Sequence, residues 1–153
     1  MSRLKDIKKM RTMAEELQLD NCAILRKYNI QELNAIYNGI GPDAFPDWLR
    51  DAISALHPSL AVVALIHDVE WHESDLSKES FTASNDRFKQ NGYAVAKSQF
   101  AWYNPRRWIV MNQARRFGNI CQALGWSAWS TPCACAVCEK NHKKEQKKCI
   151  KSI

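Results

Sequence analysis

The sequence predicts an all-α protein, and three observations support this prediction. Apolar residues recur three or four positions apart in several segments, which is the spacing of one face of a helix. Residue types that begin helices, namely proline, serine and asparagine, stand at the start of these segments. No segment alternates between apolar and polar residues for long enough to predict a strand. We therefore expect a compact multi-helix domain over residues 1–130, followed by an irregular Cys- and Lys-rich tail over residues 131–153.

Three helices are expected in the first third of the chain. The apolar face of the first is formed by Leu4, Ile7, Met10, Ala14 and Leu17. A second begins at Asn29, because Glu32 three residues later completes a capping pattern, and Gly39 ends it. After a loop at 41–46, a short helix begins at Pro46.

Two longer helices follow. Pro58 begins a helix over 58–72, and the polar sequence SDLSKES ends it. Ser77 is the expected N-cap of a helix over 78–101. One face of this helix is marked by Phe81, Ser84, Phe88 and Val95. Because the connection between the two helices is short, we expect them to be antiparallel neighbours.

The last helix of the domain is expected over 105–124, between the sequence NPRRW and Gly125. Its candidate core residues are Trp108, Met111, Ile120 and Leu124. The tryptophans of the chain are either core and helix-junction residues or, in part, an exposed aromatic patch for a partner or a lipid. They are Trp48, Trp71, Trp102, Trp108, Trp126 and Trp129.

Composition indicates a globular protein without a membrane span. Hydrophobic residues make up 46% of the 153 residues and charged residues 25%, which is ordinary for one globular domain. The longest apolar run, LAVVALI, is far shorter than the roughly 20 residues that a transmembrane helix needs. The charged N-terminus lacks the apolar centre of a signal peptide. We therefore expect a cytoplasmic protein with reduced cysteines.

The dipeptide His67–Asp68 at the end of LAVVALI is the main candidate for chemistry. Consecutive residues on a helix point about 100° apart, so the two side chains serve separate tasks. His67 would activate a water molecule, and Asp68 would bind a cation beside it. On the following helix, Asp86 could face His67 and orient it. Alternatively, both residues belong to the last turn of a buried helix, where a histidine interacts with the helix dipole and has no catalytic role.

A loop at 37–43, YNGIGPD, would complete the cation site. Gly39 and Gly41 permit unusual backbone dihedrals, which would leave carbonyl oxygens free to bind an ion. One carboxylate together with carbonyl oxygens is a ligand set that calcium accepts.

These motifs together resemble the phospholipase A2-like superfamily. The pattern is GIGP in a loop, an apolar helix running into HD, and an Asp two residues before a Phe on the next helix. It is similar in particular to short phage and prophage proteins of this layout, over residues 37–126. The resemblance implies that His67 is the general base, that Asp68 and carbonyls near Gly39 and Gly41 bind calcium, and that Asp86 orients His67. The implied reaction is hydrolysis of a phospholipid ester by an activated water.

One residue departs from the family pattern. The aromatic residue four positions after the histidine is usually a tyrosine, whose hydroxyl bonds the orienting aspartate. Here it is Trp71, which has no hydroxyl. This departure favours a scaffold without catalysis.

The tail contains a candidate zinc site. Cys133, Cys135, Cys138 and His142 offer four ligands within ten residues, and tetrahedral zinc needs four. The alternative is a tail whose thiols are partly buried against Trp126 or Trp129.

Basic residues define a candidate contact surface for nucleic acid or another partner. The tail carries Lys143, Lys144, Lys147 and Lys148, and the last helix carries Arg106, Arg107, Arg115 and Arg116. Such residues can neutralise phosphates without reading sequence. The alternative is a tail that only increases solubility.

Two functions follow from these features. The favoured one is a small phage-type accessory protein that binds a host protein or a nucleic acid without catalysis, for example as an inhibitor of host defence, in the host cytosol. The alternative is a calcium-dependent lipid ester hydrolase with His67 as general base.

Overall fold

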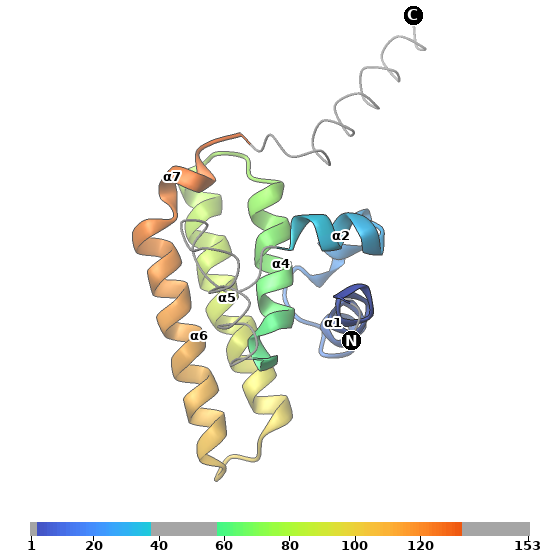
Figure 1. Ribbon diagram of the computed structural model, residues 1–153. Helices are drawn as coiled ribbons and strands as arrows, with labels where there is room; N and C mark the ends of the chain where they lie inside the picture. The colour runs from blue at the N-terminus through green and yellow to red at the C-terminus, as the bar shows by residue number, and fades with distance from the viewer. Residues whose placement is uncertain (1–2, 38–57, 133–153) are drawn as a thin grey trace, which may run out of the picture.

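The computed structural model of the chain describes residues 3–37 and 58–132, and in these two ranges the protein is all-α, without a strand (Figure 1). The elements in chain order are α1 (Arg3–Glu16), η1 (Cys22–Lys27), α2 (Ile30–Ile36), η2 (Pro58–Leu60), α4 (Ala61–His72), α5 (Lys78–Gln99), α6 (Pro105–Leu124) and α7 (Trp126–Trp129). The all-α prediction is confirmed for this part of the chain. The helix predicted from Pro46 and the tail at 133–153 lie outside it.

Three long helices form the body of the molecule. In Figure 1, α4, α5 and α6 lie side by side, and α5 contacts both of the others. Each runs antiparallel to the next, as predicted for α4 and α5 from their short connection. The N-terminal elements α1, η1 and α2 pack on the other side of α4. This places α4 at the centre and leaves α6 at an edge.

The central position of α4 explains its composition. Five consecutive residues are buried, which are Val62, Val63, Ala64, Leu65 and Ile66. A helix that is apolar on all sides must be covered on all sides, and here α5 and the N-terminal elements provide that cover. His67 and Glu70 are therefore buried as well.

Local signals begin the helices as predicted. Asn29 and Glu32 form a capping box, in which Asn29 Oδ1 accepts from the backbone N–H of Gln31 and Glu32, each at 2.9 Å. Ser77 caps α5 by accepting from the backbone N–H of Ser80 at 3.2 Å. Asn104 caps α6 ahead of Pro105.

The face that α6 turns towards α5 differs from the prediction. Its buried residues are Val110, Ala114 and Gly118. The predicted core residues Trp108, Ile120 and Leu124 are 60%, 40% and 69% exposed, so that prediction is wrong; only Met111 packs against the core.

Close approach of the two helices is the physical reason. A Cβ added at Gly92 of α5 would lie 2.3 Å from the Cβ of Ala114, and one added at Gly118 of α6 would lie 2.6 Å from Lys89 Cγ. Only small side chains fit between backbones this close, so Trp108, Ile120 and Leu124 face outward. Among the described helices, none is long and apolar enough to cross a membrane.

Candidate functional site

His67 lies in an aromatic and amide environment between α4 and α5. Its Nε2 is 3.0 Å from Asn85 Oδ1, and its ring contacts those of Trp71 and Phe88, each with a centroid distance of 5.1 Å. The side chain is 7% exposed. Burial lowers the pKa of His67 from 6.5 to about 4, against a smaller opposing effect of the hydrogen bond to Asn85. His67 is therefore a neutral imidazole at neutral pH.

A chain of amides fixes the tautomer of this imidazole. Asn85 Nδ2 donates to Gln122 Oε1 of α6 at 3.0 Å, and Gln122 Nε2 donates to Thr82 Oγ1 of α5 at 3.4 Å. Since the amide nitrogen of Asn85 is used, its oxygen is left to accept from His67 Nε2–H. The chain links three helices and satisfies polar groups that would otherwise be buried without a partner.

The prediction that Asp86 orients His67 is wrong. The Asp86 side chain is 60% exposed and pairs with Lys89, with 2.7 Å between Oδ1 and Nζ. Its neighbour Asn85 is fully buried and takes the position opposite His67. Because adjacent residues on a helix point about 100° apart, only one of the two can face α4.

This arrangement does not suit general-base catalysis. An imidazole with a pKa of about 4 holds a proton weakly at neutral pH. The amide of Asn85 also has no charge with which to stabilise the imidazolium that proton abstraction would form. Asp68, the next residue on α4, is half-buried. His67 therefore fits the interpretation as a buried residue of the core.

Trp71 has a packing role at the junction of α4 and α7. Its ring contacts Phe81 and Trp129 at centroid distances of 6.0 and 5.7 Å. A Cβ added at Gly125 would lie 2.3 Å from Trp71 Cη2, so the turn between α6 and α7 lies directly against the indole. Trp71 thus fills space that positions α7.

Glu70 is a buried charge that sequence reasoning missed. Its carboxylate accepts from Asn21 Nδ2 at 2.6 Å, from Ser84 Oγ at 2.7 Å and from Arg87 Nε at 2.5 Å. A buried carboxylate needs such partners to offset its loss of hydration. The cluster joins the segment after α1 to α4 and α5, so its role is structural. Glu70 and Arg87 lie on successive antiparallel helices, and this placement could have indicated that they pair.

The predicted metal sites rest mainly on residues outside the described ranges. Gly39 and Gly41 of the calcium site lie there, as do Cys133, Cys135, Cys138 and His142 of the zinc site and the four tail lysines. Within residues 3–37 and 58–132, no group of three or more His, Cys, Asp or Glu side chains could hold a metal ion. Both metal sites remain predictions.

The outer surface of α6 and the turn before it is the second candidate site, here called the α6 face. We define it by its exposed side chains, which are Trp102, Tyr103, Arg106, Trp108, Ile109, Asn112, Arg115, Arg116, Asn119, Ile120 and Leu124. Three of the four arginines predicted as a contact surface belong to it. Arg107 is half-buried and turns towards the α5 side.

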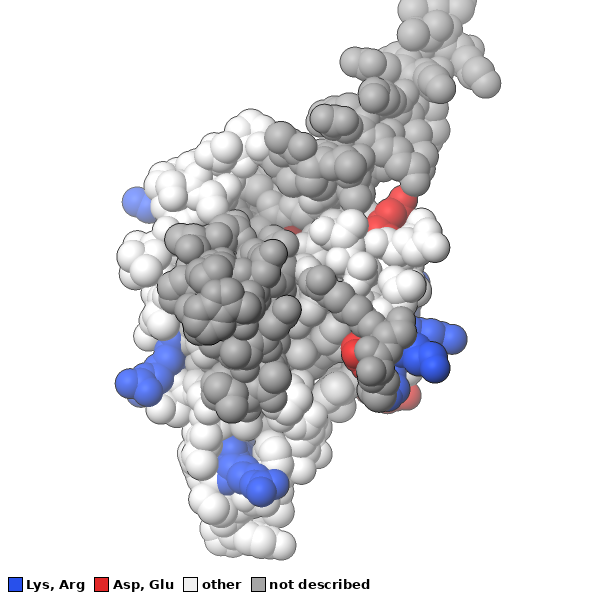
Figure 2. Space-filling view, viewed as in Figure 1, with Lys and Arg blue, Asp and Glu red and all other residues white. Residues whose placement is uncertain are grey.

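The charge of the α6 face is of one sign. Residues 87–138 contain seven Lys or Arg residues and no Asp or Glu, whereas residues 1–86 contain nine Lys or Arg against 14 Asp or Glu. On the α6 side of the view in Figure 2, the charged side chains that are visible are blue. This unequal distribution of charge between the two parts of the sequence could have indicated the α6 face.

Aromatic side chains gather at the end of the face where α5 turns into α6. Trp102 and Tyr103 are each 74% exposed, and their rings meet edge to face at a centroid distance of 5.8 Å. The turn is held by a backbone hydrogen bond of 3.0 Å from Asn104 N–H to Ala101 C=O. Trp108 follows one turn into α6. The tryptophans thus fall into two groups. Trp102 and Trp108 are exposed, whereas Trp71 and Trp129 pack inside.

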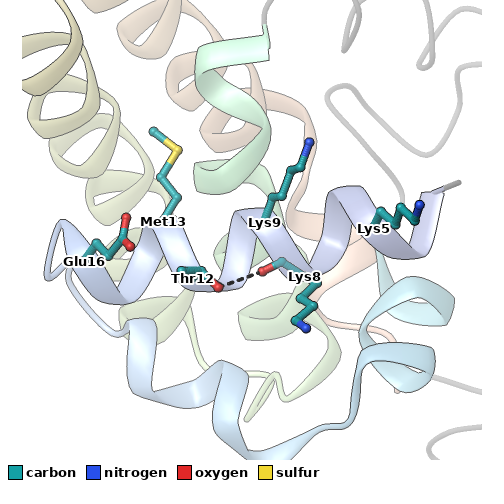
Figure 3. Close-up of a pocket in the computed structure, with 6 residues that line it drawn as sticks. All are labelled: Lys5, Lys8, Lys9, Thr12, Met13 and Glu16. Atoms are coloured by element: carbon teal, nitrogen blue, oxygen red, sulfur yellow. Dashed lines mark hydrogen bonds between the residues drawn. The ribbon is translucent and has the colours of Figure 1, made fainter. Parts of the chain in front are cut away.

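A shallow pocket on α1 is a weaker candidate. Figure 3 shows its lining residues, which are Lys5, Lys8, Lys9, Thr12, Met13 and Glu16. All six come from one helix, and in this view Lys8 points away from Lys9. The lysines therefore do not converge on a ligand.

Comparison of the chain with family models, curated proteins and solved structures gave no match. The phospholipase A2-like resemblance stays a prediction.

Proposed function

We propose that this chain is a non-catalytic binding protein that contacts an anionic macromolecule through the α6 face. The observation that carries the proposal is the combination of exposed arginines and exposed aromatic rings on a surface without a single acidic residue. The two predicted partners, a host protein and a nucleic acid, can both present negative charge to such a surface.

The apolar part of the α6 face also supports an interaction role. Trp102, Tyr103, Trp108, Ile109 and Leu124 are each more than half exposed. Large apolar side chains that gather on one surface of a soluble protein mark interaction sites. Trp, Tyr and Arg are also the residue types that contribute most to binding at interfaces.

A second copy of the chain suits this surface poorly. Arg115 and Arg116 lie at the middle of α6, which spans Pro105–Leu124. Two α6 faces related by a twofold axis would bring these arginines together, and like charges at such a contact oppose association. The partner should therefore be acidic where α6 is basic.

Affinity for a polyanion tests the proposal. The variant Arg115→Glu/Arg116→Glu reverses the charge of the α6 face from +3 to −1, and Lys8→Glu/Lys9→Glu makes the same change in net charge on α1. We expect the wild-type protein and the α1 variant to bind heparin–agarose and to elute at similar salt concentrations. The α6 variant should elute at clearly lower salt. Equal shifts for the two variants would mean that only net charge matters and would contradict the proposal.

The hydrolase alternative has its own test. A fluorogenic phospholipid is incubated with the protein in the presence and absence of calcium. Because His67 faces an amide and has a lowered pKa, we expect no hydrolysis above buffer. Calcium-dependent hydrolysis that disappears in His67→Ala would instead support a catalytic protein.

A further inference from the structure

We propose that the occupant of the α6 face is a single strand of nucleic acid, with unpaired bases stacked on the Trp102, Tyr103 and Trp108 end and phosphates bound by the arginines. This inference rests on the proposed function and names the chemical class of its partner.

Side chains along one line of α6 support the choice of nucleic acid. Trp108, Asn112, Arg115 and Asn119 are spaced by four, three and four residues and are all exposed. This spacing places them on the same side of the helix, over about 16 Å of its length. The line thus offers a ring for stacking, a guanidinium for phosphate, and two amides that can hydrogen-bond base edges or sugars.

Arg115 is held in position along this line. Its Nη2 donates to Asn112 Oδ1 at 3.1 Å, which leaves its other donors for a ligand. An arginine bonded on one side to an amide loses less side-chain freedom when it binds a phosphate. Arg116, next along α6, is also exposed and adds a second positive charge to the same part of the face.

Exposed rings favour a single strand over a duplex. The faces of bases in a duplex are covered by their neighbours, whereas an unpaired base can stack on an aromatic side chain. Trp102 and Tyr103 project from a turn, and Trp108 from the first turn of α6, so the three rings lie at one end of the arginine surface. A strand could therefore stack at this end while its backbone follows α6.

The same features argue against other anionic partners. An anionic membrane would have to accommodate Arg115, Asn112 and Asn119 in the middle of the face, where an apolar surface would be needed. An acidic protein would instead be expected to use Ile109, Ile120 and Leu124, which lie on the neighbouring line of α6. The experiment separates these two lines of residues.

Fluorescence anisotropy with three labelled probes tests the inference. The probes are a 20-mer of deoxythymidine, a 20-mer of abasic sites with the same number of phosphates, and a 20-base-pair duplex. We expect the deoxythymidine strand to bind about tenfold or more tightly than the abasic strand, because only the former can stack. The duplex should bind more weakly than the deoxythymidine strand, because its base faces are covered. Affinity for all three should fall with increasing salt.

Variants assign the effect to residues. Trp102→Ala/Trp108→Ala should lower affinity for deoxythymidine to the level of the abasic strand and leave abasic binding unchanged. Arg115→Glu/Arg116→Glu should weaken both. Ile120→Ser/Leu124→Ser is the matched control for lost apolar surface and should bind both strands like the wild type. Circular dichroism should give unchanged melting for these exposed substitutions.

The outcomes separate this inference from the proposed function. Equal wild-type affinity for the deoxythymidine and abasic strands would overturn the inference and leave a general polyanion-binding face. Polyglutamate that binds as tightly as deoxythymidine, with loss in Ile120→Ser/Leu124→Ser, would overturn it in favour of an acidic protein partner. A wild-type protein that binds no polyanion would overturn both.

Discussion

His67 of α4 and Asn85 of α5 form a hydrogen bond of 3.0 Å that is shielded by the rings of Trp71 and Phe88. The bond continues through Gln122 to Thr82, so that one imidazole is tied to both α5 and α6. This contact determines whether the centre of the molecule is a reaction site or part of the core. This imidazole is buried, covered by two rings and has a lowered pKa, so it packs as part of the core.

Replacement of Asn85 by alanine should destabilise the protein. The change leaves the imidazole N–H of His67 buried without an acceptor, and such a loss raises the free energy of the folded state by about 1–3 kcal/mol. Urea denaturation monitored by circular dichroism measures it. Asp86→Ala is the control one position along, and it removes only an exposed pair with Lys89. Similar losses for the two variants would contradict the assignment of Asn85 as the partner of His67.

Acid should destabilise the protein through His67. The pKa of His67 is about 4 in the folded protein and 6.5 as its ordinary value. Between these pH values the unfolded chain binds more protons, so the free energy of unfolding decreases as the pH falls from 6.5 towards 4. The loss between pH 8 and pH 5 should be about 2 kcal/mol from this residue.

The variant His67→Gln isolates this contribution. Half-buried His72 also has a lowered pKa and acts in the same direction, but it is present in both proteins. The wild type should therefore show a steeper decrease in unfolding free energy between pH 6.5 and pH 5 than the variant. Parallel pH profiles would show that His67 is not buried as a neutral group.

Removal of the partner of Glu70 should be more damaging than removal of a surface ion pair. Arg87→Ala leaves the carboxylate of Glu70 buried without its charged partner. The free energy of unfolding should fall by about 3 kcal/mol or more. The control is Lys27→Ala, which breaks an exposed pair with Glu73 and should lose about 1 kcal/mol or less. Chemical denaturation of both variants measures the two free energies of unfolding. Equal decreases would mean that Glu70 is solvated in the folded protein.

The contact between Gly92 and Ala114 should behave as a pair. Gly92→Ala places a methyl carbon 2.3 Å from the Cβ of Ala114, so α5 and α6 must separate. We expect the free energy of unfolding to fall by about 1–3 kcal/mol. The double variant Gly92→Ala/Ala114→Gly moves the methyl group to the other helix and should recover most of that loss. Melting temperatures test this, and a double variant no more stable than Gly92→Ala would show that another contact sets the distance.

The sequence by itself determined where helices begin and what class of fold they build. Asn29 with Glu32, Ser77 and Pro105 act within one turn of their own position, so their effect needs no knowledge of the rest of the chain. The buried face of α5, with Phe81, Ser84, Phe88 and Val95, was also predictable. There Phe81, Phe88 and Val95 recur seven residues apart, which places them on one side of the helix.

Only the tertiary structure decided how each helix is rotated about its axis. α6 has apolar residues on both sides, and its inner side was selected by α5, whose Gly92 admits Ala114 at close range. Rotation of α5 likewise set Asn85 rather than Asp86 opposite His67. Spacing along a chain defines the angle between neighbouring side chains, but the direction of the whole set depends on contacts between segments far apart in the sequence.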